Sequence, residues 1–139
     1  MASFMPSEFK SIFVRLREIL RKHAARFSVR QDGSDRYELD APVDPAALRA
    51  WSGKMKRPMI PVAWVQIGKA YVSYHLMGVY GNPSLRDSMS KELKARMQGK
   101  TCFNFRCSDE VLFRELEQLT ADAVNGFRKA GFISGQKSA

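Results

Sequence analysis

The chain has 139 residues, of which 45% are hydrophobic and 27% charged, and its formal net charge at pH 7 is +9. This length and composition are typical of one soluble globular domain with its own hydrophobic core. No apolar stretch approaches the roughly 18 residues of a membrane span, and two cysteines are too few for a disulfide framework. We therefore expect a cytoplasmic protein with reduced thiols, no signal peptide and no membrane partner.

The first expected element is an amphipathic helix, because hydrophobic residues recur at three- and four-residue steps from Phe9 to Phe27. Ser7 is a suitable N-cap, and Glu18 can pair with Lys22 one turn later. The outward positions of this helix carry cations: Lys10, Arg15, Arg17, Arg21 and Lys22.

After Phe27 the hydrophobic period changes from 3.6 to 2, which predicts a β-hairpin. Asp32-Gly33 would supply the positive φ of its turn. One helical turn capped by Asp44 is possible at residues 45–48, and residues 49–58 form a basic loop. Strands at 62–67 and 71–77 are apolar on nearly every residue, so we expect them to lie centrally in a sheet.

Ser90 is expected to cap a short helix that Gly99 ends, and a strand at 101–106 follows. Ser108 is expected to cap a final helix, whose apolar stripe runs from Leu112 to Phe127. Two long helices with one apolar stripe each can cover one face of one sheet. The sequence therefore predicts an α+β two-layer sandwich, with an antiparallel sheet and both terminal helices on one face. It forms one domain, 1–139, with an ordered core at about 7–133.

Four segments carry a family resemblance: 56–59, 65–77, 92–105 and 112–133. They resemble the YdhG-like bacterial domains, a family defined mainly as a domain of unknown function. The resemblance implies an antiparallel sheet with terminal helices on one side, similar to frataxin. Some relatives are regarded as intracellular iron chaperones, which makes iron a possible cargo.

Iron on a frataxin-like surface needs clustered carboxylate oxygens. The first helix presents mainly cations, which repel a metal ion. The acidic cluster of this chain lies on the first hairpin instead: Asp32, Asp35, Glu38 and Asp40.

A possible thiol nucleophile involves Cys102, His75 and Asn104, because an imidazole can hold a thiolate and an amide can orient the imidazole. Nothing in their spacing brings them together, and no oxyanion loop adjoins Cys102. A metal site that adds His23 and Cys107 lacks ligand spacing. We therefore expect structural roles, no catalytic residues, no resident cofactor and no enzymatic activity.

Two surfaces remain as binding candidates. The basic loop combines cations with an aromatic ring, which suits phosphate contact and base stacking: Arg49, Trp51, Lys54, Lys56 and Arg57. The second surface is the sheet face that the helices leave open, which the two central strands predict to be apolar. Its candidate residues are Trp64, Tyr71, Tyr74, His75 and Asn104.

The sequence thus favours a non-enzymatic binding module whose open sheet face holds a partner protein, a small ligand or a second copy of the chain. The alternatives are a frataxin-like iron chaperone, and anion or nucleic-acid binding through the 49–57 loop.

Overall fold

The computed structural model describes residues 6–42, 59–79, 83–99 and 101–129. Within them, six strands form one antiparallel sheet in the order β1-β2-β3-β4-β6-β5. The strands are β1 (Ser28–Asp32), β2 (Arg36–Pro42), β3 (Met59–Ile67), β4 (Val72–Leu76), β5 (Met97–Gln98) and β6 (Cys102–Phe105). The helices are α1 (Pro6–Arg21), η1 (Ala24–Arg26), η2 (Met77–Val79), α3 (Pro83–Ser88), α4 (Lys91–Lys94) and α5 (Glu110–Lys129).

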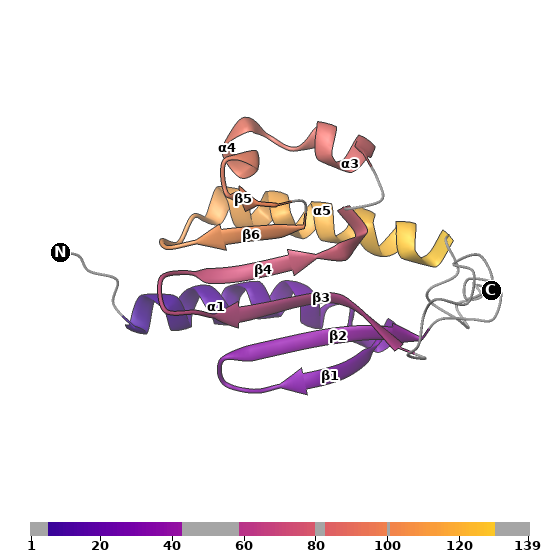
Figure 1. Cartoon of the computed structure of the whole chain (residues 1–139), viewed down its shortest axis with the longest axis horizontal. Coiled ribbons are helices and arrows are strands. Elements are labelled where there is room, and N and C mark those ends of the chain that lie inside the picture. Colours follow the sequence, from indigo (N-terminus) through magenta and orange to yellow (C-terminus); the bar gives the residue numbers. More distant parts are fainter. Residues whose placement is uncertain (1–5, 43–58, 80–82, 100, 130–139) are drawn as a thin grey trace.

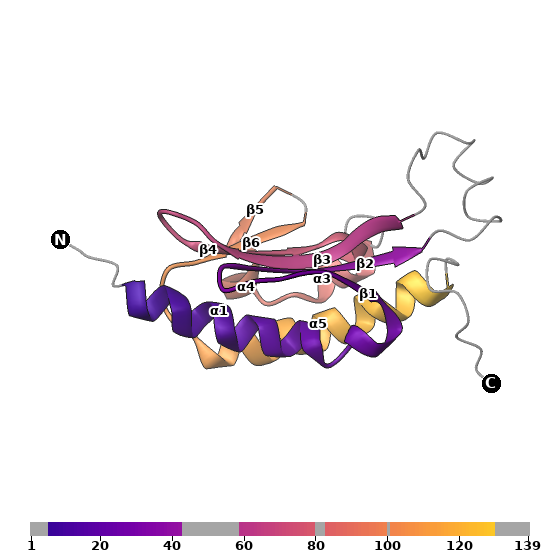
Figure 2. The same cartoon turned by 90° about the horizontal axis from the view of Figure 1, so that it is seen from below.

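The two long helices cover one face of this sheet. Figure 1 shows α1 and α5 behind the strands, and Figure 2 shows both helices on the same side. Their apolar stripes supply a large part of the buried core. The α+β class, the antiparallel sheet and the central position of β3 and β4 are thereby confirmed.

Several expected boundaries were wrong. Helix α1 begins at Pro6, so Ser7 lies inside the helix and is not its cap. Asp109 rather than Ser108 caps α5, since its Oδ1 accepts a hydrogen bond from the Leu112 amide at 3.2 Å. Among the described glycines only Gly99 has a positive φ, of 86°, so Gly33 does not supply one to the first hairpin.

The segment from 91 to 99 differs most from its prediction. Ser90 does cap α4, because its side chain accepts from the Leu93 amide at 3.1 Å. The helix ends at Lys94, however, and Met97 belongs to strand β5. Gly99 turns the chain from β5 into β6, where its positive φ favours glycine over other residues.

Cations of α1 that were expected to face solvent instead contact α5. Arg15 forms an ion pair with Glu110 at 2.6 Å and a longer one with Glu117 at 3.6 Å. Lys22 pairs with Glu117 and not with Glu18, which lies 3.7 Å from Arg21. Each half-exposed pair contributes at most about 1 kcal/mol, and the pairs add to the apolar packing of the two helices.

A buried polar contact joins the centre of the sheet to α5. Tyr74 on β4 is fully buried, and its hydroxyl lies 2.6 Å from Thr120 Oγ1. The Thr120 hydroxyl donates to the Leu116 carbonyl at 2.7 Å. Because that carbonyl can only accept, Tyr74 must donate to Thr120. Burial raises the pKa of Tyr74, so the phenol stays protonated.

This direction of donation predicts unequal effects of two substitutions that remove the same hydrogen bond. Thr120→Val leaves a buried phenol without an acceptor, so we expect it to lower the free energy of unfolding by about 1–3 kcal/mol. Tyr74→Phe removes the donor and leaves Thr120 bonded to Leu116, at a cost of about 1 kcal/mol. Urea unfolding of both variants measures the difference. A larger loss in Tyr74→Phe than in Thr120→Val would contradict the assignment.

Candidate functional site

The sheet face opposite α1 and α5, here called the open face, carries two rows of side chains that cross the strands. The strand register places four residues side by side: Arg36, Gln66, Ser73 and Asn104. Arg96 lies next in line, because the backbone N–H of Asn104 donates to the Arg96 carbonyl at 2.9 Å. We call Arg36, Gln66, Ser73, Asn104 and Arg96 the amide row. The second row is Glu38, Trp64, His75, Cys102 and Gln98, called the stack row.

Both rows are mainly polar, so the expectation of an apolar open face was wrong. Strand β4 alternates strictly between buried and half-buried residues, which sends Ser73 and His75 to the open face. Tyr74 points to the helices and is fully buried, so it cannot belong to a surface site. On β3 the extra apolar residue is Val62, which sits at a bulge where the pairing shifts between Leu39 and Asp40.

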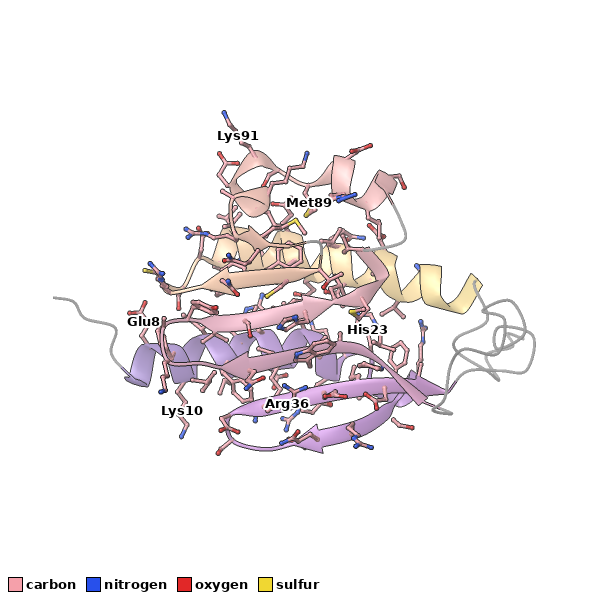
Figure 3. All side chains as sticks on the ribbon, in the orientation of Figure 1. Glu8, Lys10, His23, Arg36, Met89 and Lys91 are labelled. Carbon is pink, nitrogen blue, oxygen red and sulfur yellow. The ribbon has the colours of Figure 1, made fainter. Side chains whose placement is uncertain are left out.

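Arg36, Trp64 and His75 form a sandwich at the centre of the open face. The Trp64 and His75 rings are nearly parallel, with centroids 4.3 Å apart and planes 13° apart. The Arg36 guanidinium lies 5.6 Å from the Trp64 ring centroid and also bonds to Glu38 and Gln66. Figure 3 shows Arg36 on β2. The faces of Trp64 are therefore already used within the protein, and the indole is left with its edge for a ligand.

A chain of contacts runs from His75 to the edge of the sheet. His75 Nε2 lies 3.6 Å from Cys102 Sγ, the thiol donates to Asn104 Oδ1 at 3.3 Å, and Asn104 Nδ2 donates to Gln98 Oε1 at 3.2 Å. Since the single thiol proton goes to Asn104, the contact with His75 is best made by an Nε2–H group. These contacts hold the side-chain amides of Asn104 and Gln98 in fixed orientations.

The structure thus brings together His75, Cys102 and Asn104, whose proximity the sequence could not establish. Burial, with a smaller effect of Arg36, lowers the pKa of His75 to about 4. Burial raises the pKa of Cys102. Thiol and imidazole are therefore both neutral at pH 7, and Asn104 contacts the sulfur rather than the imidazole. This arrangement does not activate a nucleophile, which needs a thiolate.

Beside these contacts the open face has a hollow of about 170 Å³. Its lining comes from the start of β4, the β5 segment and β6: Tyr71, Ala95, Arg96, Met97, Gln98, Asn104 and Arg106. Tyr71 is half-buried, and both arginines are exposed. None of the ion pairs within the described part of the chain involves Arg96. The hollow therefore combines cationic groups, fixed amides and one aromatic ring.

Sequence reasoning selected Tyr71, His75 and Asn104 but missed Arg96 and Arg106. Arg106 could have been found, because it is two residues beyond Asn104 and so shares its face. Arg96 could not, since residues 91–99 had been assigned to a helix.

The other predicted sites have different outcomes. The basic loop residues Arg49, Trp51, Lys54, Lys56 and Arg57 lie outside the described residues. On the first hairpin, Asp32 is 3.4 Å from Arg21, Asp35 is exposed and Asp40 is buried. Although burial opposes it, hydrogen bonding to Asp40 and Arg36 lowers the pKa of Glu38. No group of three or more His, Cys, Asp or Glu in the described segments is placed to hold a metal ion.

Comparison with known proteins found no matching family model, no matching curated protein and no matching solved structure. None of the described helices is both long enough and apolar enough to cross a membrane. The function must be argued from the geometry of the open face.

The low pKa of His75 predicts a specific dependence of stability on pH. The folded value, about 4, lies below the value near 6.5 of an unfolded histidine. The contribution of neutral His75 to stability is then complete above about pH 6.5 and is lost as the pH falls toward 4. We expect His75→Gln to flatten the stability curve in this window.

NMR titration of the ring resonances measures the same property directly. His75 in the folded protein should titrate with a midpoint near 4. A midpoint close to the unfolded value would show that the imidazole is solvated, and the sandwich with Trp64 would have to be open.

Proposed function

We propose that this chain is a cytoplasmic, non-enzymatic binding module that holds an anionic ligand on its open face. The observation that supports this proposal is the convergence of Arg96, Arg106 and Asn104 on one hollow. Guanidinium groups match the paired oxygens of carboxylate and phosphate, and such charge-assisted hydrogen bonds are the strong ones. The net charge of +9 adds attraction for anions at long range.

The contact chain supports recognition rather than reaction. Asn104 and Gln98 are tied to each other and, through Cys102, to His75. Side chains fixed before a ligand arrives lose little rotamer freedom on binding, so more of the contact energy appears as affinity. Neutral Cys102 and His75 serve this purpose without supplying a nucleophile or a base.

We also propose that the chain is a YdhG-like domain with a frataxin-like arrangement. The placement of α1 and α5 on one face of an antiparallel sheet supports it. The side chains do not favour an iron cargo, because Asp32 contacts Arg21 and Glu38 contacts Arg36. A homodimer through the open face was expected because that face was predicted to be apolar. The face is mainly polar, so this support for a homodimer is lost.

Two arginine substitutions test the anion site with the same change in net charge. Arg96→Gln and Arg114→Gln each lower the charge by one, from +9 to +8. Arg114 lies on α5, which covers the opposite face of the sheet; it is 77% exposed and does not line the hollow. We expect phenyl phosphate to bind Arg96→Gln at least about tenfold more weakly, since a charge-assisted contact is worth about 1.5–3 kcal/mol.

The measurement is a titration followed by amide chemical shifts in ¹⁵N-labelled protein. Shifts should move at residues 95–98 and 104–106 of the unsubstituted chain, and Arg114→Gln should bind within about twofold of it. Equal weakening by both substitutions would mean that phenyl phosphate responds to total charge, and the site at the hollow would be wrong.

A further inference from the structure

We propose that the natural ligand is single-stranded nucleic acid, one nucleotide of which occupies the hollow. This inference rests on the proposed function and names its ligand class. It starts from the amide row, which crosses five strands from Arg36 on β2 to Arg96 beside β5. Neighbouring strands lie about 4.8 Å apart, so the row is roughly 19 Å long.

The composition of the amide row matches a polynucleotide better than a small ion. Guanidinium groups stand at both ends, that of Arg36 already bonded to Glu38 and Gln66, and between them are an amide, a hydroxyl and a second amide. Guanidinium groups bind phosphate, whereas Asn and Gln amides pair with the hydrogen-bonding edges of bases. A single inorganic anion would contact only one end of this row. A strand of several nucleotides would contact all of it.

Within the described segments, the open face offers one stacking position. Trp64 is not that position, since Arg36 and His75 cover its two faces. Tyr71 lines the hollow beside Asn104, with Arg96 and Arg106 at the same site. A base stacked on Tyr71 would place its edge near a fixed amide and its phosphates near the guanidinium groups. This combination of ring, amide and cations is the one by which open sheet faces bind single strands.

The charge of the surrounding segment fits the same ligand. Residues 91–106 carry five basic side chains and one acidic one. A polyanion gains from the cations that it contacts by releasing counterions, so its affinity depends steeply on salt. An acidic peptide would share the charge but offers no flat base edge to Asn104 and no base to Tyr71. A duplex pairs the Watson–Crick edges of its bases and stacks their faces, so no base is free to stack on Tyr71 and the duplex should bind less well.

The test measures fluorescence anisotropy of a labelled ten-nucleotide single strand at several salt concentrations. Arg96→Gln should weaken binding about tenfold and reduce the salt slope by about 0.7, the value of one phosphate contact in a single strand. Arg114→Gln, with the same charge, should leave the affinity within about twofold. Tyr71→Leu should weaken binding by roughly tenfold without changing the slope, and Tyr71→Phe should retain it.

Three ligands compete in the same assay: the duplex of the same sequence, uridine monophosphate and polyglutamate. Each should bind at least tenfold more weakly than the strand. Equal binding of any of them, or equal effects of Arg96→Gln and Arg114→Gln, would overturn the proposal. If phenyl phosphate binds at the hollow and the strand does not, the nucleic-acid inference is wrong and the anion site stands. If neither binds, both are wrong.

Discussion

The burial of Tyr74 against α5, where its hydroxyl donates to Thr120, is the constraint on which the arrangement of the open face depends. Side chains of a strand alternate between faces, so a Tyr74 held against α5 sends Ser73 and His75 to the other side. The antiparallel register then carries this choice into β3 and β6, where Trp64 and Cys102 lie opposite His75. A slip of one residue would bury the imidazole and expose the core. The buried hydroxyl pair makes that slip costly, because a misplaced phenol would lose its acceptor.

Partial burial also decides the protonation states of His75 and Cys102, which point to the open face. His75 is stacked on Trp64 and lies near the Arg36 charge, so the imidazole is poorly hydrated and loses its proton easily. Cys102 beside it is desolvated and keeps its proton. These shifts have opposite signs for an acid and a base, and both favour the neutral forms. A neutral thiol is a poor nucleophile. The neutral Cys102–His75 pair can instead hold neighbouring side-chain amides in place through its hydrogen bonds.

The sequence predicts the layers of the fold better than the site. The apolar stripes predicted both long helices, and the apolar runs predicted the central strands β3 and β4. The contact of His75 with Cys102 joins residues 27 positions apart and depends on the pairing of β4 with β6, which no local pattern encodes. Leu93 and Met97 are spaced like one face of a helix, so β5 was missed, and Arg96 with it. Tyr74 was misplaced because a tyrosine suits a surface as well as a core.

The polar character of the open face changes what can cover it. An apolar face would gain from any apolar partner in proportion to the area buried. A face of amides, guanidinium groups and ring edges gains only from a partner that replaces the hydrogen bonds these groups make to water, because an unmatched buried donor or acceptor costs about 1–3 kcal/mol. In the proposed function, Asn104, Gln66 and Arg96 would therefore select a ligand by its pattern of donors and acceptors. Nucleobases carry dense patterns of this kind beside a phosphate, which is why the geometry favours a single strand over a hydrophobic partner.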